Sequence, residues 1–596
     1  MAVVLINSFK RFVGLSWLIG PILDKELRVS SRRARNYILR FAYLVFLTTF
    51  LVLTWLEAVD YGESGLYMIS RMARAGKTIV SGTVWFQFCV TQIVVVIMLS
   101  SSISEEIYTR TLGLLMTTPI SSFQIVMGKL FSKLLQLILL LAISMPVLAI
   151  VRVFGGVPWD YIVSSLCIIL TSTFFVGSLS LFFSIFSRKT YVSIILTSLA
   201  LGALFLGIPY LVAMIHHAIT GDWPGDVLTR VLFYDNPVMV LVFNTQRMMS
   251  PGFGGGFPAF YWPLHCGIML GGSALILFAS VMMVRKVALS QAIGERHLFF
   301  RPHRTTESVE RTQSDVMREP SKIIRVEGPP VLWKEMRFPL LGRRKALTLT
   351  AVLVGLIGLL ISYLALAANN DLDDQEVHIV YAIIFLGFGM LFSIVIPATT
   401  VTSEKDSRCW PLLLATTLDD NEILLGKFVG SFRRCLPGWS LLLGHVFVFS
   451  LMGLVHPIAI CQTVILVIWI VTFLCGTGLY FSVRCKHATM AVLLNFALAA
   501  VIWAILPLFG FIALDAMNAS DDLAEAYMDT HPFFQAVVIM DATVGEESMP
   551  DYDWSGIGDA GSVESTIWML ICMGVYALLG SLFAWRAKRR LRRNIF

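Results

Sequence analysis

The chain has 596 residues, of which 57% are apolar and only 14% are charged, and its formal net charge is +7. A water-soluble globular protein of this size could not cover its surface with so few polar side chains, so that class is excluded. Most of the chain is therefore predicted to lie in lipid.

Apolar segments recur along the whole chain. Residues 1–20 are apolar with two basic residues in the middle and no small-residue cleavage site, which predicts an interfacial helix and not a signal peptide. About twelve runs follow, each of the roughly 20 residues that a helix needs to cross a bilayer. They cover residues 38–57, 82–103, 131–152, 160–186, 191–215, 262–284, 346–368, 379–402, 438–455, 458–483, 488–513 and 566–585.

These runs predict the fold class. Inside the hydrocarbon no water is available to the backbone amides, so spanning segments are either helices or the strands of a closed barrel. The runs are too long and too uniformly apolar for the alternating pattern of a barrel strand. We therefore predict an all-α polytopic membrane protein with about twelve transmembrane helices.

The charges that flank the runs predict an orientation. Basic residues crowd segments 28–35, 188–189, 285–286, 343–345 and 586–593. Residues 517–563 instead carry many acids and no Lys or Arg. By the positive-inside rule, a multi-pass protein of the cell (inner) membrane with both termini in the cytoplasm is expected. Arg71, Arg74 and Lys77 fall in a loop that this topology places outside. Anionic lipid, and not nucleic acid, is the expected partner of the basic clusters.

The sequence also repeats itself at a constant spacing, which we call the repeat offset. Residue 404 corresponds to residue 106 and residue 408 to residue 110. The segments that match at this offset are 104–115 with 402–413, 128–129 with 426–427, and 181–184 with 479–482. Each half contains an even number of runs, which predicts two parallel six-helix repeats around an axis along the membrane normal. The predicted domains are residues 1–284, a cytoplasmic charged linker at 285–328, and residues 329–596.

A motif in the second loop of each half carries the functional prediction. Glu106 and Arg110, like Glu404 and Arg408, are four residues apart with the acid first, an order that stabilises a helix by about 0.2–0.5 kcal/mol. A stretch of Leu and Thr follows, and then a capping-box pattern at residues 121–124 and 419–422. On physical grounds alone, a tight connection held by a local ion pair and a docking surface remain equally acceptable.

The pattern Glu-x-x-x-Arg-x-x-x-Leu-Leu-x-Thr-Thr-Pro, with Gly-Lys before the next apolar run, resembles the first cytoplasmic loop of type-2 permeases of ATP-binding-cassette (ABC) exporters. In that family the loop forms a coupling helix against the ATPase. The resemblance implies an ATPase-facing set of Glu106, Arg110, Thr117, Thr118, Pro119, Glu404, Arg408 and Thr416. It also implies an amphipathic connecting helix before each first span, with Lys25, Glu26, Arg28, Lys334, Glu335 and Arg337.

The second loop departs from the family pattern at two places. Trp410-Pro411 stands where the first loop has Leu112-Gly113, and Leu418 follows the threonines where a proline is expected. These differences leave the shape of the second coupling turn open.

The chain offers no site of its own for ATP or metal. Residues 74–78 look like part of a phosphate-binding loop, but Arg71 replaces the glycine that the motif requires. Any ATP and Mg²⁺ are therefore expected in a partner ATPase, present in two copies, and no catalytic or cofactor-binding residue is predicted here. His216-His217 and His265-Cys266 are interpreted as interfacial or packing residues and not as metal ligands.

The expected function is export of a substrate across the membrane, or flipping within it, by alternating access. A secondary ion-coupled transporter and a non-transporting membrane scaffold are the alternatives. The runs contain few ionisable groups, of which His445 is one, so ion coupling is less favoured. The sequence does not define the substrate.

Overall fold

A computed structural model gives the structure of the protein. It describes residues 23, 25, 28, 34–58, 65–108, 111–112, 117–153, 156–187, 189–221, 225–250, 261–292, 326–337, 345–516, 522–545 and 550–592. Almost all of these residues are helical, which confirms the predicted class. One antiparallel hairpin was not predicted: β1 (Asp551–Trp554) pairs with β2 (Gly558–Gly561) in the register Asp551 to Gly561.

The first half of the described chain is a series of long helices with shorter ones between them. In order they are α3 (Ala34–Ala58), α4 (Gly65–Ser100), α5 (Ser104–Tyr108), α7 (Ser122–Val153), α8 (Trp159–Phe186), α9 (Thr190–Gly202), the π-helix η1 (Ala203–Gly207), α10 (Ile208–Thr220), α11 (Asp226–Phe233), α12 (Pro237–Met249) and α13 (Trp262–Ala292).

The second half follows a similar order. Its helices are α14 (Pro330–Met336), α15 (Lys345–Asn369), α16 (Gln375–Thr399), α17 (Thr402–Asp406), α18 (Trp410–Leu414), α19 (Asp420–Leu451), α20 (Ile458–Arg484), α21 (Ala488–Ala500), the π-helix η5 (Val501–Ile505), α22 (Leu506–Ala516), α23 (Asp522–Met528), α24 (Pro532–Thr543) and α25 (Ser562–Arg590).

Eleven helices among the described residues are long and apolar enough to cross a membrane. They correspond to eleven of the predicted runs. The other run, 38–57, lies in α3, whose apolar part, Tyr43–Leu56, is shorter. The protein therefore has the architecture of a multi-pass helical membrane protein.

Several predictions at the ends of elements need correction or fall outside the described residues. Helix α4 already begins at Gly65, so Arg71, Arg74 and Lys77 lie in a helix and not in a loop. The phosphate-loop look-alike at 74–78 is likewise helical. Helix α13 continues to Ala292, past the predicted start of the linker. The segment 1–20 and most of the linker lie outside the described residues.

Several elements recur at the repeat offset found in the sequence. Helices α5, α7 and α9 and the π-helix η1 have the same bounds, shifted by that offset, as α17, α19, α21 and η5, respectively. The spans Thr190–Thr220 and Ala488–Leu514, which hold the fifth predicted run of each half and are called the fifth spans below, are thus interrupted at the same place by one turn of π-helix.

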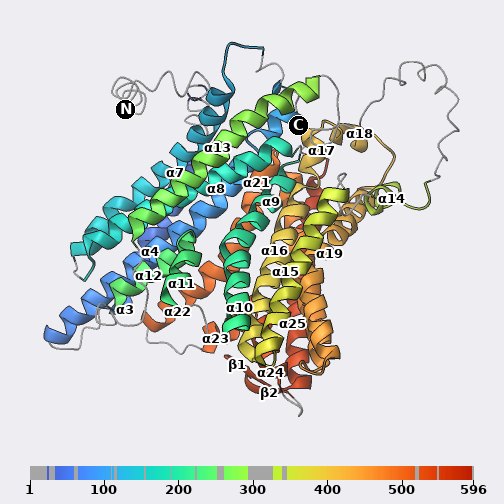
Figure 1. The fold of residues 1–596 in the computed structure, drawn as a ribbon. Helices are drawn as coiled ribbons and strands as arrows, with labels where there is room; N and C mark the ends of the chain where they lie inside the picture. The colour runs from blue at the N-terminus through green and yellow to red at the C-terminus, as the bar shows by residue number, and fades with distance from the viewer. Residues whose placement is uncertain are drawn as a thin grey trace, which may run out of the picture.

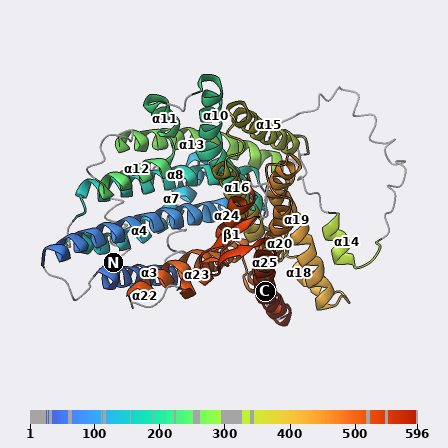
Figure 2. The ribbon, with the colours of Figure 1, turned by 90° about the horizontal axis from the view of Figure 1, so that it is seen from below.

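The two halves pack side by side and exchange their fifth spans (Figure 1). Helix α9 packs on α4 and α8 of its own half, whereas its continuation α10 lies along α15 of the second half. Helix α21 likewise packs on α16 and α20, and α22 lies along α3 of the first half. Figure 2 shows both exchanged pairs from below. Each half therefore covers part of the other.

The bundle has two distinct ends (Figure 1). The loop end carries α5, α14, α17 and α18, and the chain also returns to it, since Arg592 Nε donates to Asp420 Oδ1 at 2.8 Å. The hairpin end carries α23, α24, β1 and β2. There Asp529 Oδ2 accepts hydrogen bonds from the backbone amides of Gly556 and Ile557 and so holds the turn between the strands.

Candidate functional site

The second-half loop folds into two short helices at the loop end. Helix α17 ends at Asp406, and Arg408 follows with a left-handed backbone (φ 55°). Helix α18 then starts at Trp410 with Pro411 in its first turn, where a proline is well tolerated because the missing N–H would be unpaired anyway. The Trp410 side chain is fully buried, so it anchors the loop against the bundle.

This geometry overturns the predicted local ion pair. Because α17 stops before Arg408, Glu404 and Arg408 do not share a helix face, and the Arg408 side chain is exposed. Glu404 turns inward instead: its Oε1 accepts from Lys427 Nζ at 2.5 Å and from Lys334 Nζ at 3.1 Å. The acid therefore ties the loop to α14 and α19.

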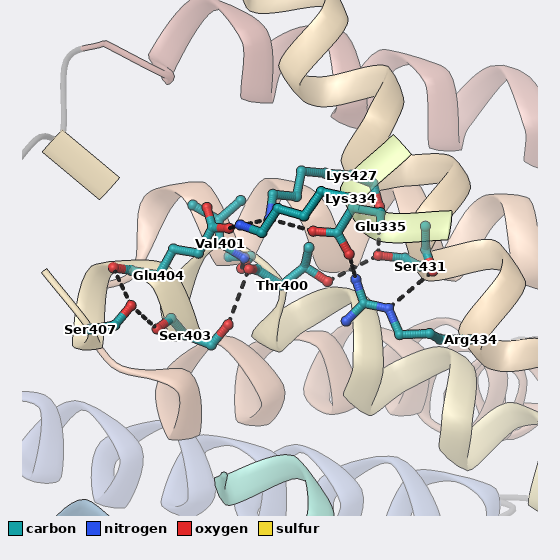
Figure 3. A network of polar contacts seen from close by, with 12 residues as sticks. Lys334, Glu335, Thr400, Val401, Ser403, Glu404, Ser407, Lys427, Ser431 and Arg434 are labelled. Carbon is teal, nitrogen blue, oxygen red and sulfur yellow. Dashed lines mark hydrogen bonds and ion pairs between the residues drawn. The ribbon is translucent and has the colours of Figure 1, made fainter. Parts of the chain in front are cut away.

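The same lysine continues the network (Figure 3). Lys427 Nζ also donates to Glu335 Oε1 at 2.7 Å, and the Arg434 guanidinium donates to Glu335 Oε2. The Lys427 and Glu335 side chains are only 2% and 6% exposed. Burial would raise the pKa of the Glu335 carboxyl, but the charges of Lys427 and Arg434 outweigh it and hold that pKa below its usual value.

Glycines bring α14 close enough to α19 for this network. A Cβ added at Gly426 would lie 2.9 Å from the Leu332 backbone nitrogen, and one at Gly430 would lie 2.6 Å from Glu335 Cβ. Two small residues four apart let helices approach closely in a membrane protein. The spacing of the two glycines therefore explains how the short helix α14 reaches the buried lysine.

The first half repeats part of this arrangement. Lys129 Nζ pairs with Glu106 Oε1 at 2.7 Å, and at the repeat offset these two positions correspond to Lys427 and Glu404. The lysine and acid side chains are 11% and 17% exposed. Both loops thus fix an inward-facing acid to the lysine of the Gly-Lys pair that follows.

A buried serine supports each loop in the same way. Ser184 Oγ accepts from the amides of Ile103 at 3.0 Å and Ser104 at 2.9 Å. Ser482 Oγ accepts from the two amides at the corresponding second-half positions, at 2.8 and 3.0 Å. Each serine satisfies two backbone donors that the end of the preceding span leaves unpaired. The start of each loop is therefore clamped to the end of the fourth span.

Only one of the two predicted capping boxes is present. In the first half the Ser121 hydroxyl accepts from the Gln124 amide, and the Gln124 side chain accepts from the Ser121 amide, both at 3.2 Å. In the second half Asp419 makes no side-chain cap, so that prediction is wrong. The neighbouring Asp420 pairs with Arg592 instead.

The predicted ATPase-facing residues separate into two groups. Glu106 and Glu404 point inward and are mostly buried, so their carboxylates are not a free surface. The residues that lie exposed at the loop end are Thr117, Thr118, Pro119, Arg408 and Thr416. Arg110 lies outside the described residues. At the loop end the turns are therefore exposed, whereas the two carboxylates are not.

A short helix lies where the connecting helix was predicted before the second half. Helix α14 contains Lys334 and the buried Glu335, and Arg337 caps it with its guanidinium 4.3 Å from the centre of the Trp333 ring. Before the first half, Lys25 and Arg28 are helical and exposed. Glu26 lies outside the described residues.

Lys129, Lys427 and Arg434 were not predicted as site residues. The Gly-Lys pairs belong to the repeat and to the family-like pattern, so a lysine that occurs twice beside an apolar run was a signal for this site. Arg434 gave no such signal, because its partner Glu335 is 99 residues away in the chain.

A second polar cluster lies inside the spans of the second half. The Tyr363 hydroxyl is hydrogen-bonded to His445 Nδ1 at 2.7 Å, and His445 Nε2 to His378 Nδ1 at 3.2 Å. His378 Nε2 in turn contacts the Leu372 carbonyl at 2.9 Å, in the loop before α16. Both histidines are buried. His445, one of the few ionisable groups that the sequence places in the spans, therefore lies within a series of hydrogen bonds.

The histidine pairs considered as metal ligands have other partners. His217 Nε2 lies 3.2 Å from Asp371 Oδ2, and His265 Nδ1 lies 2.7 Å from the Tyr234 carbonyl. Within the part of the chain that the structure describes, no group of three or more His, Cys, Asp or Glu side chains could hold a metal ion.

The fold and this site define a multi-pass helical membrane protein whose loop-end helices are fixed to the spans by buried charges. Comparison with models of known families, with curated proteins and with solved structures gives no match to this chain.

Proposed function

We propose that the chain is the membrane permease subunit of an ABC exporter, driven by a separate ATPase that seats on the exposed turns of the two loops. One observation supports this most: the exposed turn in the second half follows α17 and α18, and a network of largely buried charges joins α17 to α14 and α19. A force applied to such a turn is transmitted to the third span, because the intervening contacts are desolvated and close-packed.

The exchanged fifth spans and the repeated bounds support an arrangement of two parallel six-helix repeats. In this proposal one ATPase subunit seats at each half, with ATP and Mg²⁺ held by the ATPase. Nucleotide-driven closure rocks one half against the other, so that a substrate crosses the cell membrane or flips within it. In this proposal the loop end and both termini face the cytoplasm.

The docking test targets the exposed turns and leaves the buried acids alone. The chain is co-expressed with each ABC-type ATPase subunit of the source genome that lacks a membrane domain. We expect one of them to co-purify with the wild type. The combined variant Thr118→Lys and Leu412→Lys should lose it at least tenfold, since both side chains are exposed at the loop end, Leu412 by 70%.

The matched control places the same change at the hairpin end. Leu523 is 77% exposed on α23, so Leu523→Lys should leave co-purification unchanged. Failure of every ATPase to bind the wild type, or equal binding by the turn variant, would refute the docking proposal.

Orientation has its own test. A cysteine at Asp553→Cys, exposed on the hairpin, should react in intact cells with a maleimide that does not cross membranes. The natural Cys409, exposed at the loop end, should react only after the cells are opened. The reverse pattern would invert the topology.

The histidine cluster favours one second candidate, an ion-coupled transporter. Titratable side chains hydrogen-bonded in series within the spans are a feature of proton relays. At the repeat offset, the first half has Val80 and Val147 in place of His378 and His445. Proteoliposomes containing the chain alone and a trapped pH dye distinguish the two functions: proton flux that His378→Phe abolishes would favour ion coupling, and its absence favours the ABC exporter.

A further inference from the structure

A cavity of about 450 Å³ lies between the two halves at the loop end. Its first-half wall comes from the turn after α4, the first residue of α5 and the start of α9, including Ser101 and Tyr191. Its second-half wall comes from α14, α16, α17, α19 and the start of α21. Figure 3 shows part of that second wall, with Lys334, Glu335, Glu404, Lys427 and Arg434.

The cavity lies at the depth where spans meet the polar phase. Thr190 and Ala488 line it and are the first residues of their spans, and Thr399 lines it and is the last residue of its span. In a bilayer this level holds the lipid headgroups. A ligand of the cavity can therefore come from the membrane surface as well as from water.

Basic side chains outnumber acidic ones in the lining. The basic residues are Lys189, Lys334, Lys405, Arg408, Lys427 and Arg434. The acidic residues are Glu335, Glu404 and Asp406. Six basic against three acidic side chains leave an excess of three positive charges. Glu335 and Glu404 are paired with Lys334, Lys427 and Arg434 inside the wall, so most of the excess comes from the rest of the lining, where Lys189, Lys405 and Arg408 stand against Asp406.

Two helix starts add positive potential. Helices α9 and α21 both begin at this cavity, and their N-cap residues, Lys189 and His487, have extended backbones and make no side-chain cap. The first amides of such helices, together with the helix dipole, favour an anion. Helices α9 and α21 begin at corresponding positions at the repeat offset, so each half places a helix N-terminus at the cavity.

Arg408 contributes an independent observation. Its φ of 55° lies in the left-handed region, which a glycine adopts at no steric cost and an arginine only with strain. It follows α17 in a helix-ending turn, with the Cys409 amide donating to the Glu404 carbonyl at 3.0 Å. A long cationic side chain is thus held at a strained position on the edge of the cavity.

We propose that this cavity binds a phosphate group, presented either by the headgroup of an anionic lipid or by a water-soluble phosphate ester. Arginine, lysine and helix starts together provide the donors that phosphate oxygens accept. Basic pockets between membrane helices commonly hold such headgroups. The inference does not depend on an ATPase partner or on transport.

The test measures lipid retention by the full-length purified chain in detergent, using native mass spectrometry. Phosphatidylglycerol is compared with phosphatidylcholine of the same acyl chains. We expect the wild type to retain phosphatidylglycerol selectively, and Arg408→Gly and Lys189→Gln each to weaken its binding at least fivefold. Arg408→Gly removes the charge while relieving the backbone, so its melting temperature should be equal to or above that of the wild type.

The control and the second probe make the outcome decisive. Arg592→Gln removes an exposed arginine at the same end but outside the cavity and should retain lipid as the wild type does. Glycerol 3-phosphate is added as a competitor. If it displaces the lipid, a soluble phosphate ester is identified as a ligand of the cavity. If it does not, the site is assigned to the lipid headgroup. Equal retention of both lipids by the wild type, or a loss in Arg408→Gly and Lys189→Gln no larger than in Arg592→Gln, overturns the proposal.

Discussion

The two loops of the loop end agree in their buried contacts and differ in their exposed turns. Each loop pairs an acid with the lysine of a Gly-Lys step, and each is clamped by a serine of the fourth span. The exposed turns differ, with Thr117-Thr118-Pro119 in one and Thr416-Thr417-Leu418 in the other. The attachment of the loop to the spans is therefore common to both halves, whereas the sequence of the exposed turn is not.

The largest expected effect breaks the buried attachment. Lys427→Ala would leave the buried Glu335 without its closest lysine and deprive Glu404 of its shortest contact. Removing one partner from a buried ion pair costs about 3–5 kcal/mol. Equilibrium unfolding in mixed micelles, followed by helical circular dichroism, measures this loss. Lys129→Ala should cost less, because Lys129 and Glu106 have more access to solvent.

Lys334 provides the control for this prediction. Its side chain is 65% exposed although it contacts the same carboxylate oxygen of Glu404. An exposed pair contributes about 0–1 kcal/mol, so Lys334→Ala should be nearly neutral. A loss as large as that of Lys427→Ala would mean that burial does not explain the strength of the attachment.

A smaller effect concerns a feature that the two halves do not share. Gly430 has Ser132 as its first-half counterpart at the repeat offset, so the first half tolerates a side chain there. In the second half a new Cβ would meet Glu335 Cβ at 2.6 Å, and overpacking of this kind costs about 1–3 kcal/mol. The Gly430→Ala variant should therefore unfold at a lower denaturant concentration than the wild type.

Gly444 in the same helix is the matched control, because nothing lies within 4 Å of its added Cβ. Gly444→Ala should be neutral or slightly stabilising, since alanine favours the helix. If both variants behaved alike, the close packing of α14 on α19 would not be what fixes the network.

The serine clamps should respond equally in the two halves. Ser184→Ala and Ser482→Ala each leave two buried amides without an acceptor, at a cost of about 1–2 kcal/mol. Unfolding free energies of the two variants should agree within about 0.5 kcal/mol, the usual scatter for equivalent hydrogen bonds. Exposed Ser440→Ala should change little. Clearly unequal losses would show that the two loops are held by different means.

The smallest effect depends on pH. Burial lowers the pKa of the Lys405 ammonium to about 8, while the unfolded chain has the ordinary value of 10.5. Between these values the unfolded state binds more protons than the folded state. The free energy of unfolding should therefore rise as the pH rises from about 8 to 10.5, and this stabilisation should be lost as the pH falls back to about 8. Solvent reaches part of the side chain and limits the gain to about 1 kcal/mol. Lys405→Met should lack this rise in a pH series of melting curves.

The sequence was sufficient to predict the eleven candidate spans, because lipid imposes both their length and their composition. It missed the polar start of α4, since Gly65–Lys77 is helical but less apolar than a span. It also missed the hairpin, whose strands are four residues each, too short to stand out in the sequence. Hydropathy identifies what lies in the hydrocarbon and says little about elements that extend beyond it.

The candidate site was only half predictable, for a different reason. The spacing of Glu404 and Arg408 implied a local ion pair, and this rule assumes a helix that continues for at least one turn beyond the acid. Helix α17 ends too early, and tertiary contacts with Lys427 replace the local pair. Contacts between residues 23 to 99 positions apart, as in this network, leave no periodic signal in a single sequence.

The exchange of fifth spans has a consequence for how the protein could be divided. Helix α10 rests on α15 and α22 on α3, so neither half, made alone, would contain the surface that its own fifth span needs. A gene split between the halves should therefore yield two polypeptides that are obligate partners, each acting as the missing wall of the other. An ancestral single-half protein with this fold would have had to work as a homodimer.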